Sequence, residues 1–283
     1  MKNSKVENKS IIVGLGKTGL SVAKYFSTKG LAFKVMDTRL HPPMLEEFKK
    51  HFADVEIETG KLDIDSLVNA KELILSPGLS MKTPEIQKAK DFGIPIRGDV
   101  DIFSRTANAP IIGVTGSNGK STVVAILNDI LKKAGKRVGL GGNLDGLRSK
   151  PALDLLEEEQ KDIYLLELSS FQLETTESLG AEVAVILNLS KDHMDRYEDL
   201  TEYHEAKLRV FNDCRQLVIN RDDVYSYPTK DIDVPVWDFG FDRPGVNGLG
   251  LFENEGEQYL AYQLEKIIAV NELKIFGQHN ISN

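Results

Sequence analysis

Eight consecutive residues near the middle of the chain have the types and order needed to surround a phosphate group: Thr115-Gly116-Ser117-Asn118-Gly119-Lys120-Ser121-Thr122. The two glycines allow a tight loop whose backbone N–H groups can turn toward phosphate oxygens. Lys120 adds a compact cation that reaches terminal phosphates, and the hydroxyl of Ser121 or Thr122 can ligate Mg²⁺. The general phosphate-loop pattern requires glycine where Val114 stands, so this is the compact T-G-x-N-G-K-[ST] variant. ATP and Mg²⁺ are the ligands that this segment predicts.

A second glycine-rich segment, Gly14-Leu15-Gly16-Lys17-Thr18-Gly19, lies near the N-terminus, and Asp37 follows about 20 residues later. Such a loop lets a pyrophosphate approach a helix N-terminus, and the acid can accept hydrogen bonds from a ribose. This pattern alone leaves three interpretations open: a nicotinamide or flavin dinucleotide, another nucleotide diphosphate, or a tight turn without a ligand. The ATP-type loop further along tells against hydride transfer and favours a nucleotide-linked substrate activated by phosphoryl transfer.

Both loops lie where a short apolar run gives way to a helical pattern, which is typical of α/β units around parallel sheets. The first series predicts strands at 11–13, 33–36 and 73–75 and a helix over 18–29; the second predicts strands at 111–114, 164–166, 183–187 and 217–219, with short strands within 222–272. The helix after the loop at 115–122 carries an apolar stripe expected to be buried. The stripe consists of Val123, Ile126, Leu127, Ile130, Leu131 and Ala134.

A mixed polar stretch from Phe103 to Pro110 separates the two series, so domains of residues 1–103 and 104–283 are expected. The net charge of −8 argues against a nucleic-acid partner. The single cysteine, Cys214, allows no intrachain disulfide. The polar N-terminus lacks a signal peptide, and no apolar run is long enough to span a membrane. A cytoplasmic protein is predicted, and a monomer is expected.

Five segments, in this order, resemble the Mur ligase family: 115–122, L-E-L-S-S-F-Q-L-E at 166–174, N-L-S-K-D-H-M-D-R-Y at 188–197, A-K-L at 206–208, and G-Q-H-N-I-S-N at 277–283. The second and third are most similar to the D-glutamate-adding branch. The resemblance covers essentially the whole chain. It implies an α/β fold, with a Rossmann-like N-terminal domain that binds a UDP-linked substrate and a P-loop-type central domain that binds ATP. The family's third, C-terminal domain would be absent, so a truncated and catalytically incomplete form is expected.

The resemblance also implies a reaction. ATP would phosphorylate the carboxylate of UDP-N-acetylmuramoyl-L-alanine, and the amine of D-glutamate would displace the phosphate in peptidoglycan synthesis. No ligation by this chain alone is expected, because the family's D-glutamate contacts lie mostly in the third domain. The alternatives are another Mur-type or folylpolyglutamate-type ligase, a non-catalytic nucleotide-binding module and an NAD-dependent enzyme. Residues 1–103 discriminate against the folate type, which lacks a UDP-suited first domain.

In the central domain, the resemblance assigns Glu167 to Mg²⁺ between the ATP phosphates, beside Ser121, and His193 to a second Mg²⁺. It implies that Lys207 is carbamylated by CO₂ and becomes a metal ligand, which requires a pKa lowered by burial or nearby cations. Asn143 would contact the substrate near its reacting carboxylate. Without the resemblance, a surface glutamate, a structural histidine and a solvated lysine would be the ordinary interpretations.

Two further sets of residues follow from the resemblance. Asn280 and Asn283 would lie on the adenine side of ATP. The uridine and diphosphate would contact Lys17, Thr18, Asp37, Thr38, Arg39, Ser76, Pro77 and Gly78. The chain departs from the family pattern at 144–150, before Pro151, where the family commonly has Ile-Gly and an earlier proline.

Overall fold

The computed structural model describes residues 9–143, 150–274, 277, 281 and 282. The chain divides into two compact units, each of which has its own sheet. Unit 1 comprises Met1–Thr106, Lys150–Glu159 and Phe171–Glu177, and unit 2 comprises Ala107–Ser149, Gln160–Ser170 and Ser178–Asn283. No sequence periodicity marks the two later segments of unit 1, because their place depends on packing against residues far away along the chain.

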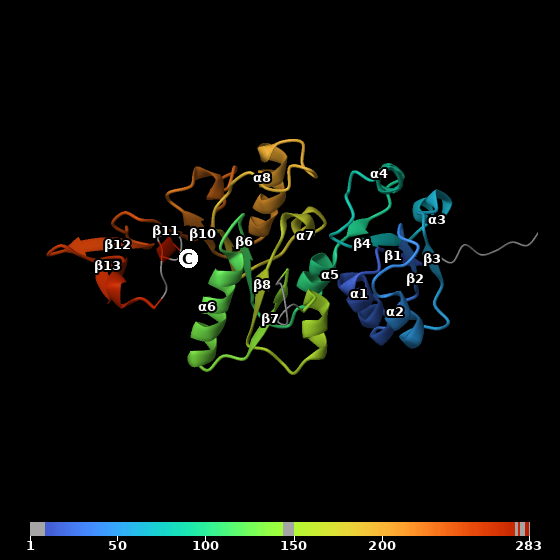
Figure 1. The fold of residues 1–283 in the computed structure, drawn as a ribbon, viewed down its shortest axis with the longest axis horizontal. Coiled ribbons are helices and arrows are strands. Elements are labelled where there is room, and N and C mark those ends of the chain that lie inside the picture. Colours follow the sequence, from blue (N-terminus) through green and yellow to red (C-terminus); the bar gives the residue numbers. More distant parts are fainter. Residues whose placement is uncertain (1–8, 144–149, 275–276, 278–280, 283) are drawn as a thin grey trace, which may run out of the picture. The chain divides into compact units, whose positions relative to one another are not determined.

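Unit 1 contains a five-stranded parallel sheet in the order β3-β2-β1-β4-β5 (Figure 1). Its elements are β1 (Ser10–Val13), α1 (Lys17–Thr28), β2 (Phe33–Asp37), α2 (Leu45–His51), β3 (Ile57–Thr59), α3 (Ile64–Val68), β4 (Glu72–Leu75), α4 (Pro84–Asp91), β5 (Ile96–Arg97), α5 (Asp99–Thr106) and the 3₁₀ helix η2 (Ala152–Glu157). The predicted strands and helix of the first series are all present. The order places the carboxyl ends of β2, β1 and β4 side by side.

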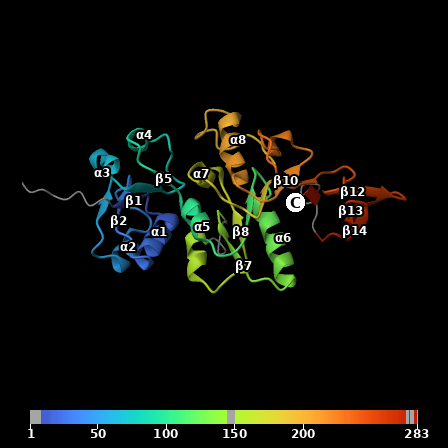
Figure 2. The same ribbon diagram turned by 180° about the vertical axis from the view of Figure 1, so that it is seen from behind.

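Alternation along the strands of unit 1 gives the sheet two apolar faces, and helices cover both (Figures 1 and 2). Ile11 and Val13 of β1 pack with residues of α3 and α4 on one face. On the other face, the rings of Phe26 and Phe33 lie 6.0 Å apart, centroid to centroid, next to the aromatic side chains of α2. The central strand is therefore buried on both sides, which fixes the position of the loop that follows it.

Unit 2 contains a nine-stranded mixed sheet in the order β14-β13-β12-β11-β10-β9-β6-β8-β7, parallel except at β12–β13–β14. Its elements are β6 (Ile111–Thr115), α6 (Lys120–Lys133), β7 (Val138–Gly142), β8 (Ile163–Glu167), β9 (Val183–Ile186), α8 (Leu200–Leu208), η3 (Arg209–Phe211), β10 (Leu217–Asn220), η4 (Val224–Ser226), β11 (Val236–Phe239), β12 (Gly248–Asn254), β13 (Glu257–Tyr262), β14 (Glu265–Ala269) and η5 (Val270–Glu272). Helix α7 (Ser170–Glu174) begins in unit 2 and continues in unit 1. The short strands expected within 222–272 are confirmed as β11 to β14.

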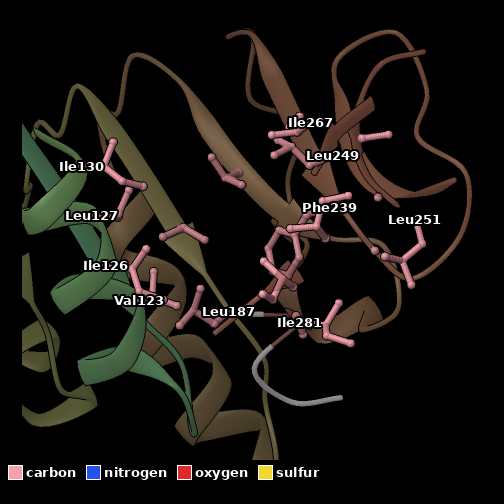
Figure 3. A pocket seen from close by; sticks show the side chains of 18 of the residues that line it. Val123, Ile126, Leu127, Ile130, Leu187, Phe239, Leu249, Leu251, Ile267 and Ile281 are labelled. Carbon is pink, nitrogen blue, oxygen red and sulfur yellow. The ribbon is translucent and has the colours of Figure 1, made fainter. Parts of the chain in front are cut away.

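The prediction that α6 buries its whole apolar stripe is wrong. Val123 is buried, whereas Ile126, Leu127 and Leu131 are half-buried, Ala134 is exposed and Ile130 is 55% exposed. The α6 side chains border a cavity of about 520 Å³ lined almost entirely by apolar residues of α6, of β9 to β14 and of the last described residues (Figure 3). The spacing predicted an apolar face correctly, but not how completely the described residues cover it.

Among the described residues, no helix combines the length and the apolar character that crossing a membrane requires.

Candidate functional site

The loop at 115–122 joins the end of β6 to the start of α6, as the sequence predicts. Gly119, the residue before the helix, has φ +84° and Gly116 has φ +151°, conformations that side-chain-bearing residues rarely adopt. A Cβ on Gly116 would also lie 3.1 Å from the Cβ of Leu187. The first turn of α6 leaves backbone N–H groups outside the helical hydrogen-bond ladder, so the loop ends in donors suited to an anion.

Three predicted side chains come together at this loop: Lys120 and Ser121 from the first turn of α6, and Glu167 from the neighbouring strand β8. The Lys120 ammonium donates to the carbonyl oxygens of Gly116 and Ser117, both at 3.0 Å. Ser121 Oγ donates to Glu167 Oε2 at 2.8 Å, and Glu167, the last residue of β8, is 3% exposed. Because β8 pairs with β6, its carboxyl end brings the carboxylate to the base of the loop.

Two loop amides are already engaged by Asn188, which follows β9 on the other side of β6. Ser117 N donates to Asn188 O at 2.9 Å, and Asn118 N donates to Asn188 Oδ1 at 2.9 Å. The Asn188 amide group returns a bond to Asn118 O at 3.0 Å. Asn188 belongs to the family segment at 188–197, but the sequence assigns it no role. Its function as an anchor of the loop depends on the strand order, which places β9 beside β6.

Lys207 is almost fully buried beneath the loop, not solvated. The carboxylate of Asp199 caps the start of α8 by accepting from Glu202 N, and this cap fixes the helix that carries Lys207. The Nζ of Lys207 lies 2.9 Å from Gly116 O and 3.3 Å from Thr115 Oγ1. Burial, helped by the charge of Lys120, lowers the pKa of Lys207 to about 7. A large fraction of this amine is therefore neutral, and nucleophilic, near pH 7.

Asn143 directly follows β7, which pairs with β8, and His193 lies in the loop that follows β9, which pairs with β6. His193 has φ +55°, an uncommon backbone conformation for a residue other than glycine. Its Nε2 lies 3.4 Å from Asp192 Oδ2, and its ring packs edge-on to that of Tyr203 at 6.4 Å between centroids. The side chain of Asn143 is exposed, and its backbone N donates to Glu167 O at 2.8 Å.

The side chains of unit 2 fit a magnesium ion that is shared with phosphate. Within the described part of the chain, no three His, Cys, Asp or Glu side chains form a ready-made metal cluster. Mg²⁺ in nucleotide sites usually takes one or two protein ligands together with phosphate oxygens and water. The hydroxyl of Ser121 and the carboxylate of Glu167 are such a pair, held 2.8 Å apart. The apolar cavity beside α6 offers no comparable oxygen donors.

The glycine loop of unit 1 is equally tight. Gly14 has φ +98°, and a Cβ on Gly19 would lie 2.0 Å from Gly14 O. The first turn of α1 can therefore pack against the loop only if residue 19 has no side chain. Ser76 Oγ, just after β4, donates to Gly14 O at 2.8 Å. Lys17 is exposed and Thr18 is half-buried at the beginning of α1.

The predicted UDP residues lie at the carboxyl ends of three adjacent strands of unit 1. Lys17 and Thr18 follow β1, Asp37 ends β2 with Thr38 and Arg39 after it, and Ser76, Pro77 and Gly78 follow β4.

Asp37 is buried and saturated with donors. Its Oδ1 accepts from Arg39 N and Nε, both at 2.8 Å, and its Oδ2 accepts from Leu15 N and Arg39 Nη2, both at 2.6 Å. Burial alone would raise the pKa of Asp37, but the hydrogen bonds from Arg39 and Leu15 and the charge of Arg39 outweigh it and lower the pKa. A carboxylate offers about four acceptor positions, and all are used here. Asp37 therefore orders its own loop in this structure.

Asn280 and Asn283, expected near the adenine, lie outside the described residues. Sequence reasoning did not single out Tyr203, which is 1% exposed and lies one helical turn before Lys207. The four-residue spacing of a tyrosine and a lysine in a capped helix was the available signal, because such residues share a helix face.

Comparisons with known proteins agree with this geometry. Residues 8–98 match the family model described as the Mur ligase MurD-like N-terminal domain, and residues 114–283 match the Mur ligase middle domain. The chain is 48% identical, over 273 residues, to the UDP-N-acetylmuramoylalanine–D-glutamate ligases of Pseudomonas savastanoi pv. phaseolicola and Pseudomonas aeruginosa. Each alignment covers 96% of this chain and 60% of the relative, so the chain spans three fifths of the length of these relatives.

Solved structures share the fold at much lower identity. The UDP-N-acetylmuramate:L-alanyl-gamma-D-glutamyl-meso-diaminopimelate ligase from Neisseria meningitides is 18% identical with a TM-score of 0.62, covering 97% of this chain and 90% of that one. MurF from Acinetobacter baumannii is 14% identical with a TM-score of 0.51, covering 98% and 55%. With a glycine loop between a strand and a helix in each unit and both family models matched in order, the chain belongs to the Mur ligase family.

Proposed function

We propose that unit 2 binds ATP with Mg²⁺ and that unit 1 binds the UDP part of UDP-N-acetylmuramoyl-L-alanine. The chain would thus carry both nucleotide sites of an enzyme that joins this substrate to D-glutamate. The cluster of Lys120, Ser121, Glu167 and Lys207 around one strand–loop–helix junction is the observation that carries the proposal. The D-glutamate specificity rests on the names of the relatives.

Each side chain of the cluster has a task that its position supports. Lys120 would exchange its two loop carbonyls for phosphate oxygens, and Ser121 and Glu167 would hold Mg²⁺, which neutralises phosphate charge when bound. His193, on its strained backbone, would hold a second Mg²⁺ and Asn143 the substrate near its carboxylate. The amides of the first turn of α6 would bind the phosphates that these cations approach.

Lys207 is proposed to carry a CO₂-derived carbamate. The lone pair of the neutral Nζ amine would attack CO₂, one proton would leave the nitrogen for solvent, and an anionic carbamate would replace the neutral amine. The buried position and the lowered pKa support this step, because only a neutral amine attacks CO₂. In ¹³C-bicarbonate, the chain should show a carbamate carbon resonance that the Lys207→Ala variant lacks; an identical resonance in both would remove the assignment.

Two alternatives are less well supported. A dinucleotide enzyme would use the acid that ends β2 to accept ribose hydroxyls, whereas all four acceptor positions of Asp37 are taken. A folylpolyglutamate-type ligase is disfavoured because residues 8–98 match a MurD-like N-terminal domain. NAD binding to the chain would reopen the first of these alternatives.

Calorimetric titration of ATP, with and without Mg²⁺, tests the proposal. Lys120→Met should raise the Kd for ATP at least about tenfold, because hydrogen bonds from a charged donor contribute about 1.5–3 kcal/mol. Glu167→Gln should mainly abolish the gain in affinity that Mg²⁺ provides. Lys133→Met, on the exposed end of the same helix, is the matched control and should bind as the unaltered chain does. Absence of ATP binding by the unaltered chain would end the proposal.

A further inference from the structure

The phenol of Tyr203 contacts Ser117 of the loop at 115–122, although Tyr203 belongs to none of the segments that mark the family. Tyr203 is 1% exposed and is among the largest fully buried side chains. It lies in α8, four residues before Lys207, so both side chains leave the helix on one face. That face contacts three consecutive residues of the phosphate-binding loop.

The hydroxyl contact has a direction that can be worked out by counting protons. Ser117 Oγ lies 3.0 Å from Ser190 O and can only donate there, because a carbonyl has no proton. Ser190 N donates to the same Oγ at 3.0 Å, which fills one of its two acceptor positions. Tyr203 Oη, at 3.1 Å, must therefore donate into the second one. Burial raises the pKa of Tyr203, which keeps this proton on the phenol.

The ring of Tyr203 meets the charged end of Lys207. Lys207 Nζ lies 4.7 Å from the ring centroid, within the range of a cation–π contact. The same Nζ donates to Gly116 O. The contact between Lys207 and the loop depends on whether the Lys207 amine is protonated or carbamylated. The hydrogen bond from the Tyr203 hydroxyl to Ser117 does not depend on the state of Lys207.

We propose that Tyr203 is a positioning residue of the ATP site, which holds Ser117 by its hydroxyl and supports the Lys207 amine by its ring. The proposal rests on the proposed function for its ligand, but the hydrogen-bond arrangement exists in the nucleotide-free chain. Tyr203 keeps the loop in the conformation that binds phosphate when Lys207 is deprotonated or carbamylated. In this proposal it acts through Ser117 and Lys207.

The test compares two Tyr→Phe variants that each remove one buried hydroxyl from unit 2. Tyr203→Phe removes the bond to Ser117. Tyr164→Phe, the control, removes a 2.9 Å bond to Asn108 Oδ1 from a residue that is 2% exposed. Three quantities are measured for both: the Kd for ATP–Mg²⁺ by calorimetry, the thermal midpoint, and the hydrogen-exchange rate of the Ser190 amide by NMR without nucleotide.

Tyr203→Phe should raise the Kd for ATP–Mg²⁺ about fivefold, the equivalent of one hydrogen bond of about 1 kcal/mol. It should also speed exchange of the Ser190 amide about fivefold, because that amide donates to the hydroxyl that Tyr203 fixes. Tyr164→Phe should lower the thermal midpoint about as much as Tyr203→Phe does, because each removes one buried hydroxyl. It should change neither the Kd for ATP–Mg²⁺ nor the exchange rate of the Ser190 amide. Unchanged Ser190 exchange in Tyr203→Phe, or an equal rise of Kd in both variants, would overturn the proposal. If the unaltered chain binds no ATP while Ser190 exchange still responds to Tyr203→Phe, the proposed function fails but the positioning of Ser117 stands.

Discussion

A buried ionisable side chain contacts each glycine loop, and the cost of burying its charge is offset to a different degree in the two units. Asp37 keeps its charge because four donors surround its two oxygens. Lys207 has two oxygen acceptors and a neighbouring cation, so burial is only partly offset and its pKa falls to about 7. A saturated group of the first kind organises its loop, whereas one of the second kind is available for chemistry.

Another buried acid, Asp99, has no such compensation and predicts a pH-dependent stability. It starts α5, is 1% exposed, and neither carboxylate oxygen has a hydrogen-bond partner of good geometry among the described residues. Burial, reinforced by the charge of Asp154 and only partly opposed by nearby amides, raises the pKa of Asp99 from 3.8 to about 6. Between these values the folded chain binds more protons than the unfolded chain, so the free energy of unfolding falls as pH rises.

Asp99→Asn, which resembles the protonated acid, should remove this dependence. Relative to the variant, the unaltered chain should lose about 3 kcal/mol of unfolding free energy between pH 3 and pH 7, at about 1.4 kcal/mol per unit of pKa shift. Urea unfolding followed by circular dichroism at several pH values measures the difference. Asp154→Asn should reduce the dependence in part, because it removes the like charge. A difference between Asp99→Asn and the unaltered chain that stays constant across this range would contradict the argument.

At the level of helices and strands, the sequence predicted what depends on local pattern. The strand–loop–helix units, the position of Lys120 at the start of a helix and that of Glu167 at the end of a strand follow from apolar runs and turn residues. The lateral strand order is not local, so the sequence did not reveal that Asn188 would anchor the loop from β9 or that Tyr203 would reach Ser117. Burial of Lys207 likewise depends on how α8 packs under β6 and not on the residues adjacent to it.

In helix α6, the spacing of apolar residues does not show how deeply each of them is buried, and this difference predicts unequal costs for two substitutions. Val124 is 0% exposed, whereas Ile130 borders the cavity and is 55% exposed (Figure 3). Val124→Ala should cost about 2 kcal/mol of unfolding free energy, because two buried methyl groups are replaced by a void. Ile130→Ala should cost less than about 0.5 kcal/mol, although it removes more carbon atoms. Denaturant titration of both variants measures the contrast, and equal losses would mean that this face of α6 is covered in solution.

At the level of the whole chain, two units with separate cores each hold a glycine loop between a strand and a helix. The loops are stabilised by different means: a saturated carboxylate in unit 1, and an asparagine with two lysines in unit 2. Neither set shares a residue with the other. Ligand specificity can therefore differ between the units although the backbone design is similar.

This separation predicts that each nucleotide stabilises only one unit. A ligand at 100 times its Kd stabilises the unit that binds it by about 2.7 kcal/mol, enough to raise a melting temperature by several degrees. In scanning calorimetry, ATP–Mg²⁺ should raise the transition of unit 2, UDP-N-acetylmuramoyl-L-alanine should raise that of unit 1, and NAD should raise neither. Lys120→Met should reduce only the first shift, by about half for a tenfold rise in Kd, and Asp37→Asn, which frees the loop of unit 1, should reduce only the second. Movement of both transitions with either ligand would show that the units unfold as one, and a shift with NAD alone would assign unit 1 to a different nucleotide.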